Sequence, residues 1–277
     1  MEFEAIGTHW WIESKLVDKQ INKIHRLIEK IDKTWSRFRD DSMVMAMAQT
    51  AGNYRLSKSD EALISWYRQL YEATDGLVTP LIGQTMSDTG YDKNYSLRSK
   101  SKISKTPEWD KVITLNQQSI TIKKAWLIDV GAAGKGFTVD KVAELLDDDY
   151  CVDAGGDIKV GNRKMKIGLE DPRDPSKLIG VVNIQNESIC GSAVHRRAWG
   201  DWHHVINPKS SSPVHDIIAT WVISDSAMQA DGLATALFFV TPDKLQHLAS
   251  FKYCIMYKDG SVEVSDDEAI TIFTEDK

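Results

Sequence analysis

Cysteine is scarce in this chain. Only Cys151, Cys190 and Cys254 occur among 277 residues; they are widely spaced, and no C-x-x-C pair is present. An odd and scattered set of this kind excludes a disulfide framework and matches no zinc-binding spacing. We therefore expect three half-buried thiols with a structural role.

Long hydrophobic runs are also missing. No segment approaches the ~20 apolar residues that a membrane-spanning helix needs. The opening residues, MEFEAIGTHWW, lack the basic start and apolar stretch of a secretion signal. The sequence therefore predicts no membrane span and a cytoplasmic protein. A chain from which a leader had been removed would look the same, and such a protein would be exported.

A surplus of positive charge is absent too. The chain has 34 Lys and Arg against 40 Asp and Glu, which gives a net charge of -6 at pH 7. A mildly acidic protein is a poor general binder of nucleic acid. The hydrophobic content of 42% suffices for the core of one compact domain over residues 1–277, or of two intimate halves of similar build.

Hairpin patterns alternate irregularly with helical ones along the chain. Apolar residues recur at helical spacing within 15–38, and a second helix opens near Ser57 and stops at Gly76. Alternating residues predict a strand at 8–14 and hairpins at 111–124 and 253–265, the last with Asp259-Gly260 at its turn. A glycine turn at 129–136 leads into a helix at 137–148. This order predicts an α+β fold of mixed sheets with packed helices.

A carboxylate interrupts an otherwise apolar helix predicted at 227–239, AMQADGLATALFF. Asp231 and Thr235 stand one turn apart and so share a helix face. A buried carboxylate must be paired, protonated or bound to a cation, and carboxylate plus hydroxyl suits Mg²⁺ or Ca²⁺ better than zinc. The alternative is that Asp231 caps the start of the helix and Thr235 packs in the core.

Three further stretches carry candidate chemistry. The turn in LIDVGAAGKGFTVD, with Lys135 beside it, offers backbone amides and a helix start to a phosphate, although it departs from the Walker A pattern. In DAGGDIKVG, two glycines permit close approach of a ligand. In HHVINP, either His203 or His204 is a candidate general base, and strand alternation brings only one of them to a site. Each stretch read alone is also compatible with a structural turn or strand.

Together these stretches resemble the FAD:protein FMN transferases of the ApbE type. The likeness extends from Gly7-Thr8 to about Val240 and rests on stretches that occur in the family's order. They are IGTHW, TWSRFRDDS, ATDGLVTPLIG, IDVGAAGKGFTVDKVAELL, VDAGGDIKVG, GLEDPRDP, HHVINP and SAMQADGLATALF. The resemblance implies a flavin transferase that splits FAD with the help of Mg²⁺. It moves FMN to a Thr or Ser hydroxyl of an acceptor flavoprotein and releases AMP.

The resemblance also implies a role for individual residues. Asp231, Thr235 and the carbonyl of Ala132 would bind Mg²⁺, and His204 would deprotonate the acceptor hydroxyl. FAD would contact Ile6, Phe38, Leu77, Val78, Thr79, Asp129, Lys135 and Val205, and the pocket would be lined by Gly155, Gly156 and Asp157.

The chain departs from the family pattern on its reactive side. The family's D-P-x-T-G after the histidine is Asn207-Pro208-Lys209-Ser210-Ser211 here, and Ala193 replaces the glycine of a T-S-G-like turn, with Ser192 retained. Two other readings therefore stay open beside transfer. One is an FAD pyrophosphatase that releases FMN and AMP to water, and the other is a flavin-binding module with little turnover.

Overall fold

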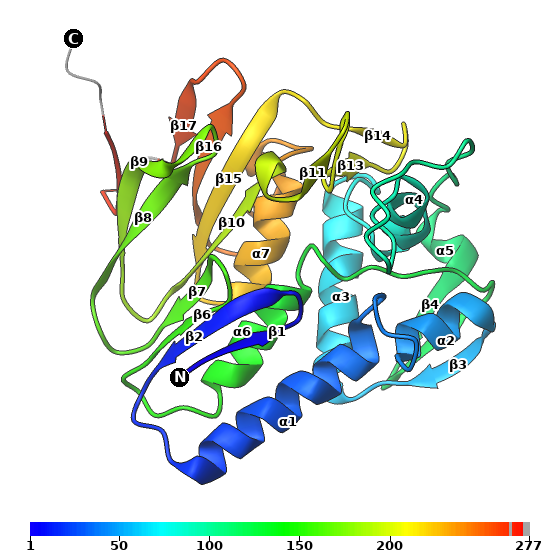
Figure 1. Ribbon diagram of the computed structural model, residues 1–277, viewed down its shortest axis with the longest axis horizontal. Coiled ribbons are helices and arrows are strands. Elements are labelled where there is room, and N and C mark those ends of the chain that lie inside the picture. Colours follow the sequence, from blue (N-terminus) through cyan, green and yellow to red (C-terminus); the bar gives the residue numbers. More distant parts are fainter. Residues whose placement is uncertain (266–267, 274–277) are drawn as a thin grey trace.

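An antiparallel sheet of eight strands forms the centre of the computed structural model, which describes residues 1–265 and 268–273 (Figure 1). In spatial order its strands are β1 (Glu2–Ala5), β2 (Thr8–Glu13), β6 (Cys151–Asp153), β7 (Asp157–Val160), β10 (Ser188–Ala193), β15 (Ile217–Ser224), β16 (Lys252–Tyr257) and β17 (Val262–Val264). Each neighbouring pair is antiparallel. The predicted α+β class is confirmed.

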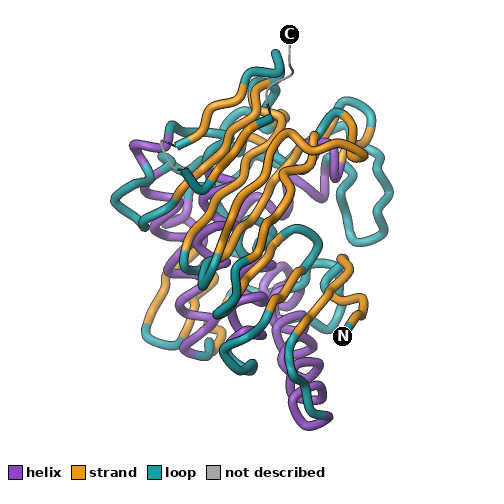
Figure 2. The backbone as a smooth tube through the Cα atoms, turned by 90° about the vertical axis from the view of Figure 1, so that its left-hand side faces the viewer, coloured by secondary structure: helices purple, strands orange, loops and turns teal. Residues whose placement is uncertain are grey.

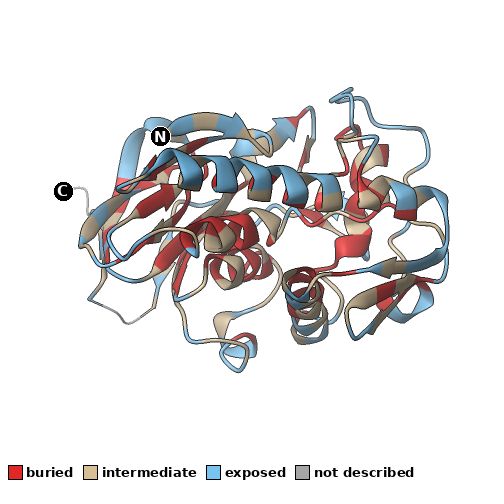
Figure 3. Cartoon of the chain, turned by 90° about the horizontal axis from the view of Figure 1, so that it is seen from below, coloured by how far each residue is buried: buried red, intermediate tan, exposed pale blue. Residues whose placement is uncertain are grey.

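Two helices, α6 (Gly134–Ala143) and α7 (Ala227–Ala236), pack directly on one face of this sheet. The other helices are α1 (Asp18–Trp35), which packs on α6, α3 (Lys58–Ala73), which packs on α7, and α2 (Met43–Gln49), α4 (Gly83–Asp88) and α5 (Trp109–Val112), which lie beyond the edge of the sheet (Figure 1). Helix α7 packs against β10, β15 and α6, so it lies at the centre of the helical layer. One face of α1 is buried along the length of the helix, and the opposite face is exposed (Figure 3).

A second, three-stranded sheet forms beside the central one, in the order β18 (Ile270–Ile272), β9 (Asp174–Ile184) and β8 (Met165–Asp171). Its apolar side chains, among them Leu169 and Val182, share a core with Ile189 of β10 and Ile223 of β15. Figure 2 shows the strands facing the viewer, with most of the helices behind them. The fold therefore buries both faces of the middle of the main sheet.

The remaining strands form small sheets at the edge of the helical layer. They are β3 (Gly52–Arg55), β5 (Ser119–Ile122) and β4 (Ile113–Asn116), with the short pairs β11 (Ala198–Trp199)–β12 (Trp202–His203) and β13 (Ile206–Asn207)–β14 (Ser212–Pro213). Single 3₁₀ turns occur at Pro80–Ile82, Val194–Arg197 and Pro242–Lys244. The predicted hairpin at 111–124 is β4–β5, and the one at 253–265 is β16–β17.

The limits of α3 follow directly from its terminal residues. Ser57 accepts the amide of Asp60 at 3.2 Å, and the Asp60 side chain accepts the Ser57 amide in return, which forms a capping box. After the helix, Gly76 adopts a φ of 80° and donates its amide to the carbonyl of Tyr71. A glycine reaches this left-handed conformation without strain, so the chain reverses there as predicted.

Both of the later helices differ from the predicted ranges, and the helix predicted at 137–148 ends at Ala143. The helix predicted at 227–239 ends at Ala236, because Phe238 and Phe239 bond to carbonyls three residues back and tighten the last turn. The helix predicted from Phe137 begins at Gly134, so the second half of the glycine turn is already helical. The first turn of α6 therefore contains Lys135 and Gly136.

Helices α6 and α7 touch through backbone at Gly136. A Cβ atom at Gly136 would lie 2.1 Å from the carbonyl oxygen of Ala227 and 2.8 Å from Cβ of Asp231. We therefore expect Gly136→Ala to push the helices apart and to lower the free energy of unfolding by about 1–3 kcal/mol. Thermal unfolding measures this loss. Gly134→Ala is the control, since its Cβ would meet only the side chain of Val130, at 3.0 Å. Equal stability of the two variants would contradict the packing argument.

Candidate active site

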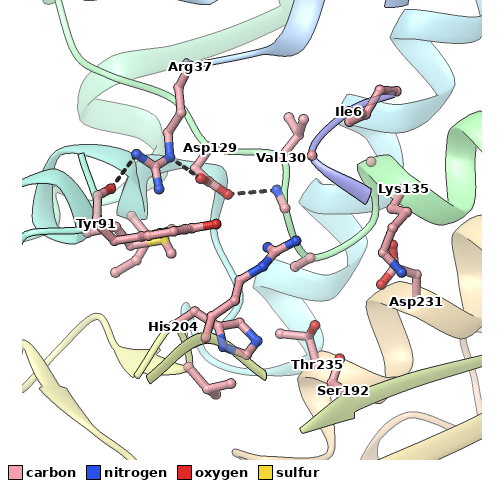
Figure 4. A pocket seen from close by; sticks show the side chains of 18 of the residues that line it. Ile6, Arg37, Tyr91, Asp129, Val130, Lys135, Ser192, His204, Asp231 and Thr235 are labelled. Carbon is pink, nitrogen blue, oxygen red and sulfur yellow. Dashed lines mark hydrogen bonds and ion pairs between the residues drawn. The ribbon is translucent and has the colours of Figure 1, made fainter. Parts of the chain in front are cut away.

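A cavity of about 790 Å³ opens where the helical layer meets the edge of the main sheet. Its walls come from the β1–β2 turn, the end of α1, the segment after α3, the turn before α6, helix α7 and residues 191–206. In Figure 4, Lys135, Asp231, Thr235 and Ser192 lie on one side, Arg37, Asp129 and Tyr91 on the other, and His204 between them. The volume lies within the ~300–1,000 Å³ typical of small-molecule sites.

Most of the site residues predicted from the sequence are brought together in this cavity. Its lining includes Ile6, Phe38, Leu77, Val78, Thr79, Asp129, Ala132, Lys135, Gly155, His204, Val205, Asp231 and Thr235. Gly156 and Asp157 were predicted in the lining as well, but the structure places them outside it. Asp157 begins β7 with no exposed surface, and its side chain pairs with Lys135 from behind the wall.

The turn between β6 and β7 presses against the N-terminal hairpin. Gly155 adopts a φ of 66°, and a Cβ there would lie 2.1 Å from Oγ1 of Thr8, which also lines the cavity. The Gly155 carbonyl accepts a hydrogen bond of 2.8 Å from Arg196. The Gly155 carbonyl therefore holds the guanidinium of Arg196, which also lines the cavity.

Asp231 is buried in the wall, with only 4% of its surface exposed. One of its oxygens accepts the amide of Gly136 at 2.9 Å. Burial and the neighbouring charge of Asp157 raise the pKa of the Asp231 carboxyl well above its ordinary value. Although burial opposes a charged ammonium, the carboxylates of Asp157 and Asp231 raise the pKa of Lys135. The result is a compact group of two acids and one base, of which Asp231 and Lys135 line the cavity while Asp157 lies behind them.

Asp231 does not cap its own helix. The N-cap of α7 is Ser226, and the amides of Ala227 and Met228 bind the Asp140 carboxylate from α6, each at 3.0 Å. The capping alternative for Asp231 is therefore wrong. These hydrogen bonds to Asp140 and the close contact at Gly136 fix the position of α7 along α6. The position of α7 in turn determines where Asp231 and Thr235 reach the cavity.

Tyr67 holds the turn before α6 from the opposite helix. Its hydroxyl accepts the amides of Ala132 at 3.0 Å and Ala133 at 3.1 Å. Burial, with the charges of Asp129 and Asp231, raises the pKa of Tyr67 well above its ordinary value, so it stays a neutral phenol. The sequence placed Tyr67 only on the apolar face of a helix, and nothing local signalled this role.

Arg37 is a second residue that the sequence reasoning missed. Its side chain is buried and pairs with the Asp129 carboxylate. It also donates a hydrogen bond of 2.6 Å to the Tyr91 carbonyl. The guanidinium also lies over the rings of Phe38, at 4.2 Å, and Tyr91, at 4.7 Å. Asp129 further accepts the Gly131 amide at 2.6 Å. Because Asp129 is held on both sides, it positions the glycine turn. A signal was present in TWSRFRDDS, where an arginine stands between aromatic residues.

Only one of the two adjacent histidines reaches the cavity. His203 is occupied by the Val214 carbonyl at 2.7 Å and by the amide of Val205 at 3.2 Å. His204 lines the cavity, and burial, with the positive charge of Arg197, lowers its pKa to about 3. His204 is therefore neutral at pH 7, and its Nδ1 has no hydrogen-bond partner among the described residues.

The departures after His204 keep the local turn intact. The side chain of Asn207 accepts the amides of Lys209 at 2.9 Å and Ser210 at 3.2 Å. This is the role an aspartate would play at the same position. The change from Asp to Asn therefore preserves the conformation beside the cavity.

Within residues 1–265 and 268–273, no three His, Cys, Asp or Glu side chains gather closely enough to hold a metal ion by themselves. None of the helices in this part of the chain combines the length and hydrophobicity that a bilayer crossing requires.

Known proteins resemble this chain in both sequence and structure. The model of the ApbE family matches residues 6–256. Proteins named FAD:protein FMN transferase are similar over nearly the whole chain. The one from Buchnera aphidicola is 24% identical and covers 93% of this chain and 85% of its own. The one from Haemophilus influenzae is 23% identical, and the match covers 94% of this chain and 85% of that protein. The solved apbe protein of Thermotoga maritima superimposes with a TM-score of 0.83 at 21% identity, covering 96% of each chain.

Proposed function

The chain belongs to the ApbE family, and from this premise we propose that it transfers the FMN part of FAD to a Thr or Ser hydroxyl of an acceptor flavoprotein, with release of AMP. The observation that carries the proposal is the cavity itself. It places an acid and a hydroxyl one helical turn apart, Asp231 and Thr235, across from a neutral histidine, His204. Such a site suits attack of a hydroxyl on a phosphate.

Asp231, Thr235 and the carbonyl of Ala132 would hold a magnesium ion. The donor set fits, because all three groups offer oxygen, and a cation beside Asp231 would lower the raised pKa of its carboxyl and favour the carboxylate form. Proteins often supply only one or two carboxylate ligands to Mg²⁺, and water and substrate phosphate supply the others. When bound, the ion would neutralise phosphate charge as the bond to AMP weakens.

The protein's own groups would carry out the remaining steps. The acceptor oxygen forms a bond to the FMN phosphorus while the bond from that phosphorus to the AMP oxygen breaks. His204 takes the proton of the acceptor hydroxyl, and AMP leaves as a phosphate monoester. Arg196 and Arg197, both in the lining, would offset the charge of the phosphates. Tyr67 keeps the turn in place through the Ala132 and Ala133 amides.

The proposal is tested by mixing the protein with FAD, Mg²⁺ and a flavin-free FMN-binding domain that carries Thr and Ser hydroxyls at its flavin site. A fluorescent acceptor band that survives denaturing electrophoresis, together with an equal amount of AMP, is the expected result. EDTA should abolish both products. An acceptor with those hydroxyls removed should lose the band.

Two outcomes would contradict transfer. AMP and FMN without a labelled band would indicate hydrolysis of FAD by water. Bound FAD with neither product would indicate a flavin-binding module. The intact turn at Asn207 supports transfer over both, because the segment beside His204 keeps its shape.

A further inference from the structure

The loop between α4 and α5 carries an aromatic side chain over the cavity. Tyr95 lines the cavity and stacks on Phe38 with a centroid distance of 5.2 Å and an angle of 7°. It is nevertheless 52% exposed, and its neighbour Leu97 is 48% exposed. Both residues have a positive φ, of 50° and 52°. The loop therefore exposes part of Tyr95 at the cavity and Leu97 two residues further along the chain.

This loop is held in place by Asp88 at the end of α4. The Asp88 carboxylate accepts the amide of Ser104 at 3.0 Å and the ammonium of Lys100 at 2.7 Å. The Leu97 amide bonds to the Gly90 carbonyl, and a Cβ at Gly90 would lie 2.4 Å from the Arg98 amide. The loop is packed against its own base, so its side chains are displayed in a fixed arrangement.

The segment 93–105, which we call the basic loop, is strongly cationic. Its charged residues are Lys93, Arg98, Lys100, Lys102 and Lys105, and it contains no Asp or Glu, although the whole chain has a net charge of -6. Lys93 pairs with Asp40 and Lys100 with Asp88. Arg98, Lys102 and Lys105 are exposed and have no carboxylate partner among the described residues.

These charges are not placed to bind a ligand inside the cavity. Of the residues in the basic loop, only Tyr95 belongs to the lining. FAD in the cavity would therefore leave Arg98, Lys102 and Lys105 in solvent. A partner that contacts the exposed part of Tyr95 from outside would also meet the exposed residues that follow it in the loop, Leu97 and Arg98, with Lys102 and Lys105 further along the same segment. The acceptor is such a partner, because its hydroxyl must enter the cavity.

We propose that the basic loop is the docking surface for the acceptor protein and that it selects an acceptor with acidic residues beside the reacting hydroxyl. This inference rests on the proposed transferase function. Tyr95 and Leu97 bury apolar side chains of the acceptor, while the three unpaired cations steer and orient its acidic segment. Complementary charge of this kind acts mainly on the rate of encounter, by factors of ~10–10³.

The test is a charge reversal, Arg98→Glu with Lys102→Glu and Lys105→Glu. The matched control reverses Lys19, Lys23 and Arg26, which are exposed on the N-terminal half of α1 and lie away from the loop (Figure 1). Both variants change the net charge equally. The substrate is the FMN-binding domain that the wild type labels. For the loop variant, kcat/KM for this acceptor should fall at least about tenfold and lose its salt dependence. The affinity for FAD should not change.

A rescue experiment sharpens the assignment. Replacing the acidic residues near the labelled hydroxyl by Lys should weaken labelling by the wild type and restore labelling by the loop variant. Unchanged labelling by the loop variant, or an equal loss in the α1 control, would overturn the docking proposal. A loop variant that labels the acceptor normally but no longer binds a fluorescent oligonucleotide would also overturn the proposal. It would show that the basic loop binds nucleic acid instead. Failure of the wild type to label any acceptor would instead overturn the proposed function.

Discussion

Asp231→Asn is expected to slow the turnover of FAD by about 10²–10³-fold, measured as AMP released per minute at saturating Mg²⁺. The reason is that the amide of Asn keeps the shape of the side chain and an acceptor for the Gly136 amide, but removes the negative charge that would hold the cation. Lewis-acid stabilisation of the departing phosphate contributes several kcal/mol, which corresponds to this range.

The same substitution should not weaken the metal-free fold. The pKa of Asp231 is raised in the folded protein, so the folded state binds the proton more tightly than the unfolded state does. Stability from this group is present at low pH and is lost as the pH rises from about 4 through the raised pKa. An uncharged Asn avoids that loss. We therefore expect thermal unfolding of apo Asp231→Asn at pH 8 to occur at or above the wild-type temperature.

Asp225→Asn is the matched control, because it removes the same charge from an exposed residue just before α7. It should leave FAD turnover and its Mg²⁺ dependence unchanged. Thr235→Val keeps the size of the side chain but removes the second proposed oxygen ligand, so it should raise the Mg²⁺ concentration needed for half-maximal rate. If Asp231→Asn turned over FAD at the wild-type rate, the metal assignment would be wrong.

His204→Gln is expected to slow transfer to the acceptor by about 10²–10⁴-fold while FAD binding persists, because the proposed general base would be lost and the cavity wall retained. Single-turnover labelling with pre-bound FAD measures the chemical step, and flavin fluorescence measures binding. Equal losses in binding and transfer would indicate a structural role for His204 instead.

The pH dependence of transfer separates a base from a structural histidine. In the free protein the pKa of His204 is about 3, since burial and Arg197 disfavour its charged form. FAD phosphates near Arg197 would offset that positive charge and raise the pKa toward its ordinary value. The single-turnover rate should therefore fall as the medium is acidified, with an inflection above pH 3 that is absent in His204→Gln. His203→Gln, which breaks the bonds to Val214 and Val205, should destabilise the fold but retain the inflection.

Local sequence patterns were sufficient to predict those helices and hairpins whose boundaries are set by residues close together in the chain. The capping box at Ser57, the reversal at Gly76 and the hairpin turn at Asp259-Gly260 each involve residues within a few positions of one another. The start of α6 was misplaced because glycine-rich segments give no helical periodicity. The expectation of two similar halves stays a prediction.

The site was only partly predictable, because its supporting contacts join distant segments. Arg37 and Asp129 are 92 positions apart, and Tyr67 and Ala132 are 65 apart, so no local pattern connects them. Asp157 was expected in the lining from the resemblance to the ApbE type. In the structure it is the first residue of β7, and strand pairing with Cys190 directs it beneath α6 toward Lys135. The register of the sheet, which the sequence left open, decides its place.

The cavity takes its walls from residues as far apart as Ile6 and Phe239. No proteolytic fragment that lacks either end of this span would retain a complete ligand site. Binding of FAD and the global unfolding equilibrium are therefore thermodynamically linked, and FAD at one hundred times its dissociation constant adds about 2.7 kcal/mol of apparent stability. The amides at the N-terminus of α7 and those of the β1–β2 hairpin, although remote in sequence, should become protected from hydrogen exchange together when the ligand binds.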